Sequence, residues 1–265
     1  MMMTLVGIGY RASLVEWVGS GPPEIECLEL TAEHFFDQSD EAIVAVAADR
    51  PVFVHGLGLS LATPGPLDSE TLQSFQRVVE LSRPKWISEH LAFTRTAEVD
   101  LGHLNPVPPT HEMLERISDN AIALSEACNK PLILENITSH VMVAGEMDEP
   151  SFLNQLCSRA GCGLLVDVTN LYINSKNHGF DPLEWLHQLN PKTIVQLHIV
   201  GYSYRDGRWH DSHHEPIQKD LFELCQAVVE YAPVKAIIIE RDGNFPDPQQ
   251  LAGELRTIKA FCNGD

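Results

Sequence analysis

The feature that most constrains the fold is a series of eight short apolar segments rich in β-branched residues. They are mostly separated by segments with helical spacing, and they span residues 5–11, 25–30, 51–56, 85–90, 131–136, 163–168, 193–200 and 234–240. Continuous apolar strands of this kind are buried on both faces, as in a parallel sheet. Eight such units predict an α/β protein with a closed (β/α)8 TIM barrel, which needs about 250 residues. Because the chain has 265 residues and no linker or repeat, we expect 1–265 to form one domain.

The segments between these strands supply the expected helices. Residues 68–81 have apolar side chains at helical spacing, with Asp68 or Ser69 as a plausible N-cap. Residues 110–130 form the clearest helical pattern, and further helices are expected at 40–50, 149–160, 181–189, 217–231 and 247–261. The link 11–24 holds at most a short helix, and the polar stretches 94–109 and 201–209 are expected to be loops.

Six consecutive predicted strands end on a histidine or an acid, namely His55, His90, Glu135, Asp167, His198 and Glu240. Strand side chains alternate between faces, so the residue two positions earlier points the same way. Those earlier residues include Phe53, Ile133, Leu165 and Ile238, and Trp86 faces the same way four positions before His90. This alternation predicts apolar layers in the barrel lumen below a polar ring. Since this fold builds its sites at the C-terminal ends of the strands, the ring is the candidate site.

Each ring residue also has a structural explanation. A single strand-end histidine is often only hydrogen bonded, Asp167 and Asn170 could cap the following turn, and Glu135 and Glu240 could pair with arginine. Together, however, these residues favour a metal site, because buried carboxylates need cations. The predicted ligand set adds Asn170 and an Asp-x-His triplet after the seventh strand, and comprises His55, His90, Glu135, Asp167, Asn170, His198, Asp211, His213 and Glu240. His210 or His214 could replace His213.

Nine candidate ligands exceed what one ion needs, and they suit two or three metals with bridging carboxylates. The set holds no cysteine, so oxygen and imidazole ligands favour iron or manganese, with zinc possible. None of the six cysteines forms a C-x-x-C pair, which argues against a thiolate zinc site. Five further residues on rim segments are candidates for contact with substrate: Tyr10, Arg11, Ser88, Asn105 and Tyr202.

The formal net charge of −19 disfavours binding to nucleic acid or to anionic membranes, which attract basic faces. No apolar run reaches 18 residues and no secretory signal is visible at the start, so we expect a cytoplasmic protein.

At these residues the sequence resembles the multinuclear non-heme iron-dependent oxidative enzymes, the family of the methanobactin-biosynthesis oxidase and of the enzyme that makes 3-thiaglutamate. The matching pieces cover almost the whole chain. They are Gly7-Ile8-Gly9-Tyr10-Arg11, His55-Gly56-Leu57-Gly58-Leu59-Ser60, Ser88-Glu89-His90-Leu91-Ala92-Phe93, Leu134-Glu135-Asn136-Ile137, Asp167-Val168-Thr169-Asn170, His198-Ile199-Val200-Gly201, Asp211-Ser212-His213 and Glu240-Arg241-Asp242.

The resemblance implies a xylose-isomerase-like barrel that holds two or three irons and uses dioxygen as co-substrate. It assigns one iron to His55, His90 and Glu135. It assigns another to Glu135, Asp167, His198 and Glu240, and a third, more labile one to Asn170, Asp211 and His213. The family modifies ribosomally made precursor peptides, usually at cysteine. It often works with a partner protein that recognises the leader peptide, which we expect to be a separate polypeptide.

Three other functions remain open. A metal-dependent sugar isomerase or epimerase would use a divalent ion to polarise a sugar oxygen and a carboxylate as base. Lysines near the rim would favour this function, and Lys176 is the candidate. A trinuclear zinc endonuclease would need a basic phosphate-binding face, against which the net charge of −19 argues. A non-catalytic metal-dependent peptide-binding protein would keep the ligands without a redox-active metal.

Overall fold

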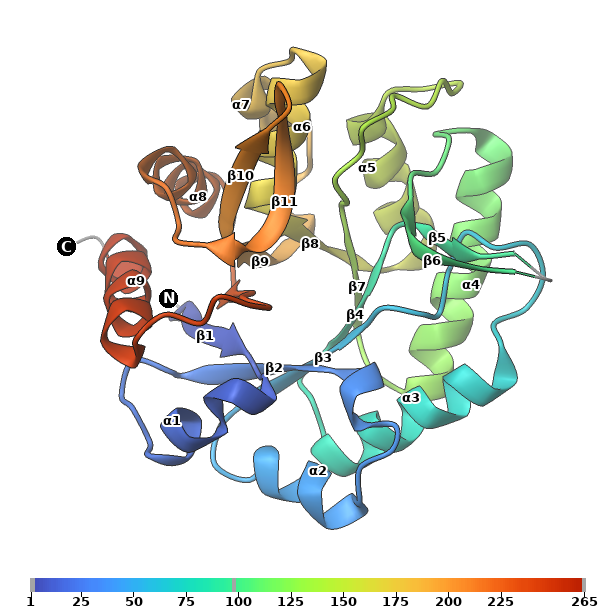
Figure 1. Ribbon diagram of the computed structural model, residues 1–265. Helices are drawn as coiled ribbons and strands as arrows, with labels where there is room; N and C mark the ends of the chain where they lie inside the picture. Colours follow the sequence, from blue (N-terminus) through green and yellow to red (C-terminus); the bar gives the residue numbers. More distant parts are fainter. Residues whose placement is uncertain (1–2, 97–98, 264–265) are drawn as a thin grey trace.

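Eight parallel strands close into a barrel in the computed structural model, which describes residues 3–96 and 99–263 (Figure 1). The hydrogen-bonded order is β1-β12-β9-β8-β7-β4-β3-β2, so the last strand closes on the first. The barrel strands are β1 (Leu5–Gly9), β2 (Cys27–Thr31), β3 (Val52–Gly56), β4 (Ile87–His90), β7 (Leu132–Glu135), β8 (Gly163–Asp167), β9 (Ile194–Ile199) and β12 (Ala236–Ile239). The predicted (β/α)8 barrel is confirmed. The prediction that 1–265 form a single domain stays a prediction.

Helices pack around the outside of the barrel (Figure 1). Asp68 caps α3 by accepting a hydrogen bond from Thr71 N, as its sequence position predicted. The helices are α1 (Val15–Gly19), α2 (Asp40–Val46), α3 (Ser69–Ser82), α4 (His111–Cys128), α5 (Glu149–Ala160), α6 (Val168–His178), α7 (Pro182–His187), α8 (Lys219–Tyr231) and α9 (Pro248–Asn263), with 3-10 turns at Ala12–Leu14, Ala32–Phe35 and Pro191–Thr193. No helix in the described ranges is both long and apolar enough to cross a bilayer.

Three regions differ from the sequence expectation, namely two strand pairs and one helix. The stretches expected to be loops carry antiparallel pairs, β5 (Phe93–Arg95) with β6 (Asp100–Asn105) and β10 (Gly201–Arg205) with β11 (Arg208–Glu215). Helix α6 begins directly after β8, although its β-branched residues have low helix propensity. Asp167 starts this helix by accepting from Asn170 N, and Gly179 ends it in the left-handed conformation.

The hydrophobic core has two parts. The larger lies between the barrel and its helices, and a smaller cluster fills the lumen. The lumen cluster contains all the apolar residues expected beneath the polar ring, including Phe53 and Trp86, whose rings stack with centroids 4.1 Å apart. Its members are Cys27, Phe53, Trp86, Ile133, Leu165, Ala236 and Ile238. Because this cluster fills the lumen, the strand-end side chains lie at the C-terminal mouth of the barrel.

Candidate metal centre

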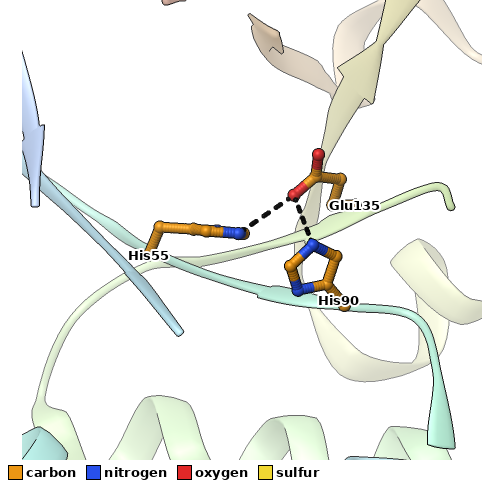
Figure 2. Close-up of side chains that lie close together, drawn as sticks. All are labelled: His55, His90 and Glu135. Carbon is orange, nitrogen blue, oxygen red and sulfur yellow. Dashed lines mark ion pairs between the residues drawn. The ribbon is translucent and has the colours of Figure 1, made fainter. Parts of the chain in front are cut away.

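The first group of potential ligands comes from three neighbouring strands. His55 lies at the end of β3, His90 ends β4 and Glu135 ends β7. Figure 2 shows both imidazole rings directed at one carboxylate oxygen. His55 Nε2 lies 3.2 Å and His90 Nε2 lies 3.4 Å from Glu135 Oε2. All three side chains are buried, and together they could hold one cation.

The second group shares Glu135 and adds Asp167, His198 and Glu240, from the ends of β8, β9 and β12. His198 Nδ1 lies 3.0 Å from Glu135 Oε1 and 3.0 Å from Glu240 Oε2. The ligand atoms of this group all lie within 4.8 Å of one another. Glu135 therefore offers one oxygen to each group, which is the geometry of a bridging carboxylate.

A third group lies nearer the surface and joins His213, Glu240 and Asp242. His213 Nδ1 is 3.0 Å from Asp242 Oδ2 and 3.8 Å from Glu240 Oε2. His213 adopts φ of 52°, a left-handed conformation that is uncommon outside glycine and occurs often at functional sites. Arg11 is paired with Glu240 and Asp242, with its Nη2 2.6 Å from Asp242 Oδ1. Asp242 was not among the expected ligands.

The remaining candidates of the Asp-x-His region are distributed around this third group. Asp211 Oδ1 lies 2.9 Å from His213 Nε2, the ring nitrogen that does not face Glu240. Asn170 lines the cavity above the three groups, but its side-chain oxygen accepts from Thr138. His214 packs against Gly243, where a Cβ would lie 2.6 Å from its Nε2. Of the neighbouring histidines, His213 is thus the one placed beside Glu240.

Several buried polar atoms in and beside these groups have no partner in hydrogen-bonding geometry within the described residues, although some of them lie close to another potential ligand. Buried polar groups in proteins are nearly always satisfied, so a cluster of orphaned atoms needs an explanation. They are His55 Nε2, His90 Nδ1, Glu135 Oε2, Asp167 Oδ2, Asp211 Oδ1 and His213 Nδ1. Asp167 is instructive, because one of its oxygens caps α6 while the other is orphaned. The donor set, which is oxygen and imidazole only, fits cations of the iron, manganese or zinc type.

The electrostatics agree with a site built for cations. Burial raises the pKa of Asp167 to about 8, helped by the neighbouring Asp211 and Glu135. Burial, followed by the nearby His90, lowers the pKa of His55 well below its usual value. Burial opposes protonation of His90 as well, but Glu135 and Glu89 outweigh it and raise the pKa of His90 to about 9. A metal ion would relieve both the carboxylate repulsion and the competition for protons.

Sequence reasoning missed three acids around the ligands. Glu29 on β2 lies 2.7 Å from His198 Nε2, Glu89 accepts from the backbone N–H of His90, and Asp242 contacts His213. Alternation along β2 would have revealed Glu29, because Cys27, two positions earlier, belongs to the lumen cluster. The position of Asp242 depends on the loop after β12, which no local pattern specifies.

The residues expected to touch substrate occupy varied positions. Ser88 is buried and its Oγ lies 2.8 Å from His55 Nδ1, and Arg11 pairs with Glu240 and Asp242. Tyr10 lines a neighbouring cavity of about 510 Å³ together with Arg11. Asn105 donates to Phe93 O, while Tyr202 stacks on Tyr172 and donates to Asp220. Substrate contact by these five residues stays a prediction.

A cavity of about 600 Å³ opens above the three groups. His90, Glu135 and Glu240 line it from below, and the β5–β6 pair contributes Arg95 and His103 to its wall. A small molecule or a side chain of a larger substrate would reach the ligand groups through this space.

Comparison with solved structures places the molecule among xylose-isomerase-like barrels. The xylose isomerase domain protein from Planctomyces limnophilus superposes with a TM-score of 0.65 at 13% identity, covering 99% of this chain and 98% of that one. Endonuclease IV from Thermus thermophilus gives a TM-score of 0.63 at 14% identity, covering 98% and 100%. At these identities the likeness concerns the fold.

The sequence comparisons are more specific. The chain belongs to the family of RiPP precursor modification enzymes MbnB/TglH/ChrH, whose family model matches residues 5–263. A UPF0276 protein from Caulobacter vibrioides is 31% identical over 256 residues, covering 95% of this chain and 90% of the relative. Another from Chromobacterium violaceum is 31% identical over 261 residues, covering 97% and 95%. The resemblance noted in the sequence is confirmed, and family and fold together indicate an enzyme.

Proposed function

We propose that this protein is a multinuclear iron-dependent oxidase that uses dioxygen to modify a ribosomally synthesised precursor peptide, at cysteine, together with a separate partner protein that recognises the leader. The observation that carries the proposal is the shared use of Glu135 and Glu240 by three converging ligand groups. Such sharing suits two or three adjacent ions rather than one. Membership of a family of RiPP precursor modification enzymes supports a peptide as the substrate.

In this proposal His55, His90 and Glu135 hold one iron, and Glu135, Asp167, His198 and Glu240 hold a second. His213 and Glu240 hold a third with Asp242, Asp211 and Asn170 nearby. Bound iron would pass electrons from the peptide to dioxygen and would offer a coordination position for a cysteine thiolate.

The protein's own residues orient these ligands and control the charge around them. Ser88 fixes the ring of His55, and Glu89 faces His90 Nδ1 at 3.6 Å. Arg11 partly neutralises Glu240 and Asp242, which keeps two carboxylates close together. The cavity of about 600 Å³ is large enough for a peptide side chain, which would exclude bulk water from the buried groups below it.

One observation disfavours the epimerase alternative. The candidate rim lysine, Lys176, is exposed and its Nζ lies over the ring of Tyr172, 4.9 Å from the centroid. Lys176 does not line the cavity above the ligand groups, whereas Arg95 does.

The test is a mass measurement. Protein reconstituted with ferrous iron without oxygen is mixed in air with the partner and with a cysteine-bearing peptide encoded beside its gene. We expect a change in peptide mass that requires iron, oxygen and the peptide cysteine. Zinc-loaded protein and a Cys→Ser peptide are the controls. An unchanged mass with the complete iron-loaded system would refute the proposal.

A further inference from the structure

A chain of buried polar groups connects His198 to the floor of the barrel. Trp86, Gln196, Glu29 and His198 are 8%, 0%, 2% and 0% exposed. Trp86 Nε1 donates to Gln196 Oε1 at 2.7 Å, and Gln196 Nε2 donates to Glu29 Oε2. Glu29 Oε1 then lies 2.7 Å from His198 Nε2. Glu29 thus engages both of its oxygens within this series of contacts.

The hydrogen bonds between these four side chains can run in only one direction. An indole N–H can only donate, so the oxygen of the Gln196 amide must face Trp86 and the nitrogen must face Glu29. A carboxylate can only accept, so His198 must donate to it through Nε2. By the same rule His198 Nδ1 donates to Glu135 and Glu240, both 3.0 Å away, when no metal is bound. A cation held by these two carboxylates would take the place of that proton, and Nδ1 would then offer its lone pair while Nε2 keeps its proton.

One contact competes with this direction. Gln196 Nε2 lies 3.2 Å from His198 Nε2 and would reverse the tautomer if it donated there. The contact between His198 Nε2 and Glu29 Oε1 is shorter, at 2.7 Å, as expected for a hydrogen bond to a charged acceptor. A lone pair on Nε2 would instead repel the carboxylate oxygen, so donation from Nε2 to Glu29 is the arrangement that satisfies all three groups.

We propose that Trp86, Gln196 and Glu29 are positioning residues that select one tautomer of His198, so that this histidine binds metal through Nδ1. His55 and His90 differ, because each presents Nε2 to Glu135. The inference rests on the proposed function only in requiring a metal at the second group. Outer partners of this kind fix the tautomer and orientation of metal-binding histidines.

The informative variant is Glu29→Gln. If the new amide keeps its oxygen toward Gln196, its NH₂ group faces His198 Nε2 and moves the ring proton to Nδ1. If the new amide turns round, its oxygen accepts from His198, but its NH₂ group then faces the NH₂ group of Gln196, which is unfavourable. Either result disfavours metal binding through Nδ1. Loss of such an outer partner typically weakens metal binding by about 10–100-fold, and we expect a loss of this size.

An exchange of the two side chains supplies the rescue. In Glu29→Gln/Gln196→Glu, Trp86 donates to the carboxylate, which accepts from the amide, whose oxygen again accepts from His198. The direction of the chain and its net charge are both restored, so metal affinity should return toward that of the wild type. Glu26→Gln is the matched control, because it neutralises an acid three residues earlier that binds Lys259 instead.

Affinity is measured for Zn²⁺ and, without oxygen, for Fe²⁺, by chelator competition and elemental analysis. The proposal is supported if Glu29→Gln binds weakly, the exchange variant recovers and Glu26→Gln is unchanged. It is overturned if Glu29→Gln binds like the wild type, or if the exchange variant binds no better than the single variant.

A second measurement needs no change to Glu29. In zinc-loaded wild-type protein with ¹⁵N-labelled histidine, the signals lost in His198→Gln identify the His198 ring. A proton on Nε2 supports the proposal, and a proton on Nδ1 overturns it, even if Glu29→Gln fails to fold. These readouts use no peptide, partner or oxygen. Wild-type protein that binds metal but leaves peptide unmodified would therefore refute the proposed function alone, whereas wild-type protein that binds no metal would refute both.

Discussion

The first and third ligand groups differ in what holds them. His55, His90 and Glu135 stand on three adjacent barrel strands, and the side chains of His55 and Glu135 are 0% and 2% exposed. His213 and Asp242 come from the β10–β11 pair and the loop after β12, and their side chains are 18% and 44% exposed. Both groups have side chains that can bind metal, but only the first is held entirely by the backbone hydrogen bonds of the barrel sheet.

This difference indicates how the two positions should behave. Groups carried by packed barrel strands lose little freedom when they bind an ion, whereas groups on a two-stranded hairpin and a loop must be ordered first. We therefore expect tight, slowly exchanging metal at the buried groups and a more labile ion near the cavity. The following changes test this contrast.

The largest effect is expected for Glu135→Gln. Glu135 offers one oxygen to each buried group, so its loss removes the link between them. We expect bound iron to fall by up to two equivalents. Peptide modification should drop by more than the roughly 10–100-fold that loss of an outer partner costs. Elemental analysis and the mass assay measure the two effects.

Asp148→Asn is the control for Glu135→Gln, because it neutralises an acid that caps α5 and belongs to none of the three ligand groups. Asparagine caps helices about as well as aspartate, so folding should be unaffected. Full iron content in Glu135→Gln would mean that this residue does not link the two groups.

A smaller and more selective loss is expected for His213→Asn. Asparagine tolerates the left-handed backbone that His213 adopts, so the hairpin should keep its shape. We expect the loss of a single metal equivalent, the one that a mild chelator removes first from the wild type. Stepwise chelation followed by elemental analysis provides the measurement. Simultaneous loss of every ion would show that the groups are not independent.

The smallest effect is expected for Ser88→Ala. Ser88 Oγ bonds His55 Nδ1 at 2.8 Å, so removing it frees the ring without removing a ligand. Affinity at the first group should weaken by about 10-fold, the lower end for outer partners, with the outer ion unaffected. Ser118→Ala is the matched control, since Ser118 is also buried but bonds Leu114 O within α4. Equal effects of the two variants would contradict a role at His55.

The sequence was a good guide wherever position followed from strand alternation. His55, His90, Glu135, Asp167, His198 and Glu240 each lie at the end of an apolar strand, and a closed parallel barrel brings such ends together regardless of detail. The lumen floor of Phe53, Trp86 and their neighbours followed from the same alternation.

Where the chain leaves the barrel strands, local patterns were insufficient. Helix α6 forms from β-branched residues because its caps at Asp167 and Gly179 and its packing outweigh propensity. The β10–β11 pairing depends on contacts between residues that carry no clear strand pattern. Asp242 contacts His213 because of the conformation of the loop after β12, and this contact is visible only in the tertiary structure.

The pairing of Arg11 with Asp242 joins residues 231 positions apart. During synthesis on the ribosome, the early histidines leave the exit tunnel long before the last strand and its acids. The complete site therefore exists only after the segment that carries Glu240 and Asp242 has left the tunnel and closed the barrel. We expect iron to be loaded into an already folded protein rather than to template its folding.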